Sequence, residues 1–213
     1  MKLDFLPAHA LSDGAAHHYC LRCRGEAVRW RTTADGRRHC ACGACGHVAD
    51  RALVLDPAVR WWTDDEGEYW HETAGVFVRD VHGRVLLFDR TAFPFGLTIP
   101  AGHVECHEHP DEAAARELSE ETGIAGEPLE QLATIAVPGD GCRRGADAHL
   151  WHVYRTAEAV DADRAVELGP EGTSALWLTP DEALTRPVTH AVSRLLEVFR
   201  DALVPSGAAG SPR

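Results

Sequence analysis

Three glutamates, Glu117, Glu120 and Glu121, stand at positions i, i+3 and i+4 of a segment with helical character. On an α-helix these positions share one face within one turn. Three carboxylates on one face repel one another, and hard oxygen donors spaced this closely suit Mg²⁺ or Mn²⁺, which removes the repulsion. The neighbouring Arg116 points roughly the other way in a helical projection. Taken on the helix alone, the competing interpretation is a solvated acidic surface.

The helix that must carry these glutamates has clear boundaries in the sequence. Pro110 occupies a first-turn position, Asp111 and Glu112 follow where acidic groups favour the helix dipole, and Gly123 is placed as a C-cap. A neighbouring apolar stripe is expected to pack on a sheet. It consists of Ala114, Ala115, Leu118 and Thr122.

The cysteines indicate a second chemistry. Five of the seven lie between residues 20 and 45, while Cys106 and Cys142 stand alone. Clustering without a secretory signal favours metal binding over disulfides. Two Cys-x-x-Cys pairs are 18 residues apart and predict a tetrahedral four-thiolate Zn²⁺ site. The predicted ligands are Cys20, Cys23, Cys42 and Cys45.

The residues between the two pairs describe a zinc ribbon. Val28–Thr32 alternates like a strand, and Ala34-Asp35-Gly36 supplies a turn. A four-thiolate site leaves no open position for water, so the zinc should be structural. Cys40 is an alternative to Cys42 or Cys45, and otherwise a bystander with His39 and His47.

The whole segment from Gly102 to Ile124 resembles the Nudix box. That pattern is Gly, five residues, Glu, seven residues, Arg-Glu, an aliphatic, any residue, Glu-Glu, any residue, Gly and an aliphatic, and every fixed position is met. The resemblance implies that Glu117, Glu120 and Glu121 bind the catalytic Mg²⁺ or Mn²⁺. The Gly102 carbonyl and Glu105 are the supplementary ligands that the family often uses.

The resemblance also assigns the other residues of the box. Arg116 should pair with Glu108 and brace the loop against the helix. Glu120 is the expected catalytic base, and Glu171 is the alternative. The histidines at 103, 107 and 109 occupy variable positions, where we expect solvent-exposed, capping or substrate-edge roles and no metal binding.

A Nudix hydrolase cleaves the pyrophosphate of a nucleoside diphosphate linked to another moiety. A zinc ribbon ahead of such a domain resembles the NADH pyrophosphatases. Their further Ser-Gln-Pro-Trp-Pro-Phe-Pro signature is absent, because the corresponding stretch reads Ala136-Val137-Pro138-Gly139-Asp140. NADH is therefore not the favoured substrate. The family's habit of dimerising makes a homodimer the expected assembly.

The remaining patterns predict an α+β domain in which a mixed sheet lies between helices, the α/β/α sandwich of a Nudix fold. Strands are expected at 73–79, 84–90, 129–137, 149–156 and 174–178, a capped helix from Thr179, and helical spacing over 188–204. The expected organisation is an N-terminal extension (1–19), a zinc ribbon (20–50), a connector (51–67), the Nudix domain (68–204) and a disordered tail (205–213).

Substrate contacts are weakly marked. Arg143 and Arg144, in a Gly-rich loop, are candidates for phosphate binding, and Phe95 is a candidate for stacking on a base. Trp61, Trp62, Trp70 and Phe93 have the same aromatic chemistry but are expected more often in a core. For the two arginines the competing interpretation is a solvated loop.

Composition narrows the class of partner. The net charge of −12 disfavours general binding to nucleic acid or a membrane surface. The sequence has no apolar stretch long enough for a membrane helix, so a cytoplasmic protein is expected. A regulator that senses a nucleotide, with the Arg-rich ribbon touching nucleic acid, is the alternative function. An isoprenoid diphosphate isomerase is a third, disfavoured by the intact hydrolase box.

Overall fold

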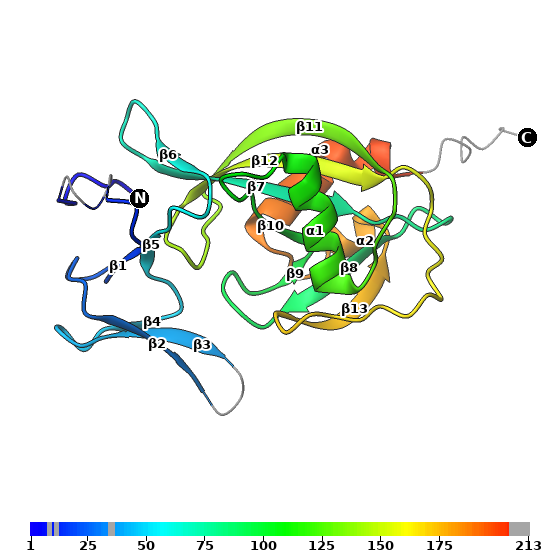
Figure 1. Ribbon diagram of the computed structural model, residues 1–213. Coiled ribbons are helices and arrows are strands. Elements are labelled where there is room, and N and C mark those ends of the chain that lie inside the picture. Colours follow the sequence, from blue (N-terminus) through cyan, green and yellow to red (C-terminus); the bar gives the residue numbers. More distant parts are fainter. Residues whose placement is uncertain (8–9, 11–12, 34–36, 205–213) are drawn as a thin grey trace, which may run out of the picture.

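The structure is a computed structural model that describes residues 1–7, 10, 13–33 and 37–204. A small β-rich module lies beside a larger α+β domain that carries the helices of the described chain (Figure 1). The turn expected at 34–36 and the tail expected at 205–213 lie outside the described residues.

The small module is a three-stranded antiparallel sheet in the order β2-β3-β4. Its strands are β2 (Val28–Thr32), β3 (Arg38–Cys42) and β4 (Val48–Ala49). The strand predicted at Val28–Thr32 is confirmed. Val28 pairs with Cys42, so the second Cys-x-x-Cys pair begins where β3 ends and the chain turns.

A second, two-stranded sheet joins this module to the larger domain. It pairs β1 (His17–Tyr19) with β5 (Leu53–Leu55). The backbone of the same segment also contacts a distant loop, because the Val54 N–H donates to the Arg144 carbonyl at 2.9 Å. The side chains of Leu53 and Leu55 are buried against Tyr69 of the larger domain. Residues 53–55, expected in a connector, therefore belong to a packed core.

The main sheet has the order β10-β7-β12-β11, with β6 also paired to β7. Only the β7–β12 pair is parallel, so the sheet is mixed as predicted. The strands are β6 (Trp61–Thr63), β7 (Tyr69–Phe77), β10 (Ala101–His103), β11 (Leu129–Pro138) and β12 (Ala148–Thr156).

A second sheet of the domain has the order β13-β8-β9. Its strands are β8 (Val85–Arg90), β9 (Leu97–Thr98) and β13 (Gly172–Leu178). The helices are α1 (Pro110–Thr122), α2 (Pro180–Leu184) and α3 (His190–Leu203).

Two apolar cores separate the layers, and successive side chains of β7 contribute alternately to the two cores. Phe77 packs in the core that α3 covers, while Val76 and Val78 pack in the core that α1 covers. Figure 1 shows α1 and α3 on opposite sides of the sheet. The domain is therefore the predicted α+β sandwich.

Strand β7 begins four residues before the predicted position of 73. The reason is a hairpin with β6 that sequence alternation did not reveal. Asp64 Oδ1 accepts hydrogen bonds from the backbone N–H groups of Glu66 and Glu68, which closes the turn. Trp62 then stacks on its cross-strand partner Trp70, with ring centroids 6.1 Å apart.

Among the helices of the described residues, none is long and apolar enough to cross a membrane.

Candidate functional site

The helix α1 forms as its local signals predict. Pro110 opens it, and Gly123 ends it in the left-handed region at φ 70°. Its buried stripe is Ala113, Ala114, Leu118 and Thr122, whereas Ala115 is exposed. The stripe is thus shifted by one residue from the prediction, because Ala113 and not Ala115 faces the core. Packing of this stripe turns the acidic face toward β10, where the Ala101 N–H donates to Glu121 and Gly102 meets Glu117.

The three glutamates lie at different depths. Glu117 and Glu121 are half-buried, and the Glu120 side chain is 61% exposed. Glu121 Oε2 accepts a hydrogen bond from the Ala101 N–H at 2.8 Å. Burial raises the pKa of both inner carboxyl groups, that of Glu121 to about 8. Desolvated carboxylates on one face need a nearby positive charge, which is the condition that a hard divalent cation satisfies.

The glycine of the box meets this face directly. A Cβ atom on Gly102 would lie 2.0 Å from Glu117 Oε1, so a side chain at this position would displace the carboxylate. Glu105 follows on the same loop, and its N–H donates to Glu108 Oε2 at 3.2 Å. Gly102, Glu105 and the three glutamates all line one pocket of about 430 Å³. The donor set and its position therefore fit a Mg²⁺ or Mn²⁺ ion.

The prediction that Arg116 points away from the acidic face is wrong. Its guanidinium donates to both carboxylate oxygens of Glu108, at 2.8 and 2.9 Å, and to Glu117 Oε1 at 2.6 Å. It also contacts Glu120 Oε2 at 3.4 Å and donates to the His103 carbonyl at 3.2 Å. A helical projection places Cα atoms, but the long arginine side chain reaches back over the turn. Hydrogen bonding to Arg116 lowers the pKa of Glu108.

Arg90, Arg143 and Glu171 also line this pocket. Arg143 Nη1 donates to Glu171 Oε1 at 2.9 Å, and Arg90 Nη2 lies 3.6 Å from Glu171 Oε2. Arg144 also lines the pocket, but its guanidinium is held by Asp56. Both arginines proposed from the sequence thus line the same pocket as the glutamates.

The aromatic candidates divide. Phe95 is 43% exposed and is not among the described residues that line the pocket; the guanidinium of Arg37 lies over its ring, at 5.5 Å. Phe93 lines the pocket instead. Trp61 packs edge-on against Tyr69 in a core, and Trp62 stacks on Trp70. Among these candidates Phe93 is therefore the one that lines the pocket, and Trp151, which was not a candidate, lines it too.

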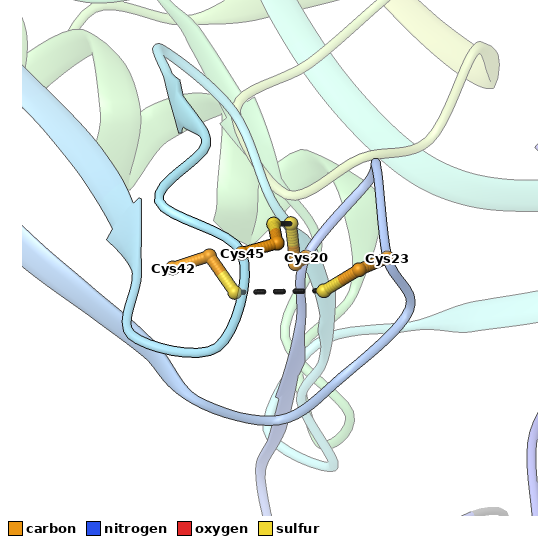
Figure 2. A group of neighbouring side chains, drawn as sticks. All are labelled: Cys20, Cys23, Cys42 and Cys45. Carbon is orange, nitrogen blue, oxygen red and sulfur yellow. Dashed lines mark hydrogen bonds between the residues drawn. The ribbon is translucent and has the colours of Figure 1, made fainter.

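The four cysteines of the two Cys-x-x-Cys pairs converge (Figure 2). Sγ of Cys20 and Cys45 are 3.8 Å apart, and Sγ of Cys23 and Cys42 are 3.6 Å apart. Thiolates bound to zinc in a tetrahedron, each at about 2.3 Å, are separated by about 3.8 Å. The cluster is therefore compatible with a small zinc ribbon. Cys40 lies outside it, since its Sγ donates to the Arg51 carbonyl at 3.2 Å.

The structure also brings together a second group that sequence patterns did not reveal. His71, His103, Cys142 and His149 each offer one ligand atom, and these atoms lie within 4.8 Å of one another. Cys142 was expected to stand alone, and His103 to be solvent-exposed or at the substrate edge. In the structure Cys142 is buried within this group, and His103 has a buried Nε2 but also lines the pocket, as a residue at the substrate edge would.

Comparison with known proteins identifies the family. The NUDIX domain matches residues 69–199, which is more than half of the chain. The chain therefore belongs to the Nudix family, and the resemblance of the box is confirmed.

Two relatives show how far the similarity extends. The chain is 34% identical over 140 residues to a putative 8-oxo-dGTP diphosphatase 3 of Mycobacterium tuberculosis, covering 60% of this chain and 62% of the relative. It is 33% identical over 129 residues to the CTP pyrophosphohydrolase of Escherichia coli, covering 59% and 87%. The chain thus spans less than two thirds of the mycobacterial relative.

Among solved structures, the NUDIX domain of Shewanella oneidensis NrtR, in complex with ADP ribose, superposes with a TM-score of 0.54. Its identity is 20%, and the match covers 67% of this chain and 94% of that one. At this identity the similarity is one of fold.

Proposed function

We propose that the chain is a metal-dependent pyrophosphohydrolase that cleaves the pyrophosphate bond of a nucleoside diphosphate linked to another moiety. The observation that carries the proposal is the pocket that the complete set of box donors shares with Arg90 and Arg143. Glu117, Glu120 and Glu121 would hold Mg²⁺ or Mn²⁺, with the Gly102 carbonyl and Glu105 completing the site. The names of the relatives, a diphosphatase and a pyrophosphohydrolase, support the same reaction class.

The chemistry follows from the charges. A divalent ion bound at the glutamates would neutralise the anhydride oxygens and lower the pKa of the attacking water. The water attacks phosphorus, the bridging P–O bond breaks, and the leaving phosphate departs with the bridging oxygen. Arg143 would bind a phosphate oxygen in the same pocket, in place of part of its present contact with Glu171.

Glu120 is the proposed base. Its carboxylate is the most exposed of the three box glutamates and is therefore free to accept the proton from water. Glu171, the alternative, is occupied by Arg143 and Arg90, which hold its two oxygens. Glu171 thus contacts two arginines, against one at 3.4 Å for Glu120, so Glu120 is the more available of the two carboxylates to a water.

The pair Glu108–Arg116 is proposed to brace the metal loop. Arg116 joins Glu108, Glu117 and the His103 carbonyl, which lie on the loop, the helix and β10. A structural Zn²⁺ on Cys20, Cys23, Cys42 and Cys45 is proposed for the ribbon, supported by the separation of the sulfurs.

The regulator remains the second candidate because the ribbon carries exposed arginines on its strands and turns. These are Arg22, Arg24, Arg29, Arg31, Arg37 and Arg38. Such a surface could contact a polyanion. The complete acidic set in the pocket favours catalysis over sensing. A DNA probe that shifts in a salt-dependent manner would support the regulator, and no binding at low salt would exclude it.

The deciding experiment is product analysis with Mg²⁺ and a panel of substrates. The panel contains NADH, NAD, ADP-ribose, nucleotide sugars, dinucleoside polyphosphates and nucleoside triphosphates. We expect a nucleoside monophosphate product, reduced about 10²–10⁴-fold in Glu120→Gln. Glu158→Gln, an exposed loop residue outside the pocket, should retain full activity. Silence across the panel from folded, zinc-containing protein would overturn the proposal.

A further inference from the structure

The four-residue cluster of His71, His103, Cys142 and His149 (the His₃Cys cluster) lies inside the catalytic domain, apart from the ribbon cysteines. His71 comes from β7, His103 from β10 and His149 from β12, while Cys142 lies in the loop between β11 and β12. The sheet order places β10, β7 and β12 side by side, so three adjacent strands each contribute one imidazole. The ring centroids of His71 and His103 are 4.6 Å apart, and each lies 5.6 Å from that of His149.

The two hydrogen bonds of the Tyr69 hydroxyl fix the tautomer of His71. The Tyr69 hydroxyl donates its single proton to the Val54 carbonyl at 2.9 Å. The same hydroxyl lies 2.6 Å from His71 Nε2, so it must accept a hydrogen from that nitrogen. His71 Nδ1 is then a bare lone pair, and it faces Cys142 Sγ at 3.6 Å.

His149 is arranged in the same way. Its Nδ1 lies 2.9 Å from the Asp140 carbonyl oxygen and 3.1 Å from Asp140 Oδ2, both of which accept hydrogen bonds. Its Nδ1 therefore carries a proton, and in the neutral imidazole Nε2 has a lone pair for the cluster. Asp140 is itself fixed, since its Oδ2 accepts from Trp151 Nε1 at 2.8 Å.

His103 differs from the other two histidines, because one of its ring nitrogens has no partner within the described part of the chain. Its Nε2 is buried and has no hydrogen-bond partner among the described residues. His71 is fully buried, and His149 and Cys142 are 3% and 8% exposed. One thiol proton can satisfy only one of the nitrogens that surround the sulfur. An unpaired buried nitrogen beside further lone pairs is costly unless a cation lies between them.

We propose that the His₃Cys cluster binds a transition-metal ion, with Zn²⁺ as the expected occupant. Three imidazole nitrogens and one thiolate form a borderline-soft donor set that suits zinc in a tetrahedral site. The hydrogen bonds from His71 to Tyr69 and from His149 to Asp140 are the outer contacts that orient metal-bound histidines. The Asp140 carboxylate also balances the positive charge left by Zn²⁺ and one thiolate. Four protein ligands leave no position for water, so the role is structural.

The ion would fix two parts of the catalytic pocket. His103 directly follows Gly102, whose backbone meets Glu117. Cys142 directly precedes Arg143, the proposed phosphate ligand. Bound to both, the ion would hold β10, which carries Gly102, and the loop that carries Arg143 in a fixed relation. Three of its ligands, His103, Cys142 and His149, line the same pocket as the box glutamates, but the ion would use none of those carboxylates and its binding would not depend on the reaction that they perform.

The test is metal analysis of the full chain, purified with zinc and dialysed against excess Mg²⁺ to clear the carboxylates. We expect two zinc ions per chain in the wild type. Cys142→Ser and His71→Gln should each lose one ion and keep the other. Cys106→Ser and His152→Gln are matched controls, because both residues lie outside the two clusters, and they should retain both ions.

The zinc-edge X-ray absorption spectrum of the wild type provides a readout that needs no variant. A four-thiolate site contributes sulfur scattering only, so imidazole scattering reports the His₃Cys cluster. Imidazole scattering that disappears in a variant still holding ribbon zinc supports the proposal. Imidazole scattering at the absorption edge of another first-row ion would support it as well. A sulfur-only spectrum, or two ions retained in both variants, would overturn it. One ion per chain with imidazole scattering would support this site and count against zinc in the ribbon.

Discussion

The ribbon and the catalytic domain are stabilised by different means. Among the described residues, the apolar core beside the ribbon holds three buried side chains, Cys40 of the ribbon and Ala52 and Val54 of the following segment, whereas the core under α3 holds fifteen. A core of three side chains cannot offset the conformational entropy of some thirty residues, so the ribbon requires a cross-link. The catalytic domain buries enough apolar side chains to fold without a metal at its box glutamates. Those carboxylates are therefore available for catalysis.

The largest expected effect is loss of the ribbon alone. Cys42→Ser should unfold residues 20–50 and release their zinc, because about 10–16 kcal/mol of metal-binding free energy supports such modules. Limited proteolysis and zinc content measure this, and the catalytic sheet should remain protected. Cys40→Ser is the control, since Cys40 Sγ lies outside the thiolate cluster. Equal zinc loss in this control would place Cys40 among the ligands.

A core truncation should reverse the pattern. Leu196 is fully buried under α3, so Leu196→Ala should lower the free energy of unfolding of the catalytic domain by about 2–5 kcal/mol. Denaturant unfolding measures the change, while ribbon zinc should be retained. Val198→Ala, on the same helix but 47% exposed, should stay within about 0.5 kcal/mol. Simultaneous loss of zinc with Leu196→Ala would mean that the two regions unfold as one unit.

An intermediate effect is expected at the carboxylates that are proposed to bind Mg²⁺. Arg116→Lys replaces the two-pronged contact with Glu108 by a single donor, so the affinity for Mg²⁺ should fall about 10–100-fold. The Mg²⁺ dependence of activity measures this, and ribbon zinc should not change. Arg194→Lys on the exposed face of α3 serves as control. An unaltered Mg²⁺ dependence would remove the bracing role.

The smallest effect concerns a turn held by a buried carboxylate. Asp80 accepts hydrogen bonds from the N–H groups of His82 and Arg84 and from the Arg84 guanidinium. Burial opposes its charge, but these bonds outweigh burial and lower the pKa of Asp80.

Its stabilisation is therefore present above the unfolded pKa of about 3.9 and is lost as pH falls through the lower folded value. Asp80→Asn should cost about 1–3 kcal/mol of unfolding free energy at neutral pH and less in acid. Chemical unfolding at both pH values tests this, with the exposed Asp65→Asn as control. A cost independent of pH would contradict the assigned charge.

The sequence predicted what depends on spacing within one segment. The box helix, its caps and the two Cys-x-x-Cys pairs are local patterns, and each appears where it was expected. What it missed depends on side-chain reach and on the register between distant strands. Arg116 bends back over its own helix turn, and Phe93 rather than Phe95 lines the pocket. The His₃Cys cluster draws on three strands and a loop, and nothing in the separate positions of His71 and Cys142 links them before the sheet is known.

The parallel pairing of β7 with β12 has a consequence for the order of folding. Most of the domain, including α1 and β8 to β11, lies between these two neighbours in sequence. The strands of the ribbon, by contrast, pair only with strands close to them along the chain. During synthesis, β7 must wait for residues 148–156 to leave the ribosome, while the ribbon can already close. We expect zinc capture to precede the burial of Trp151 in refolding. A zinc indicator would monitor the first event, and tryptophan fluorescence would monitor the second.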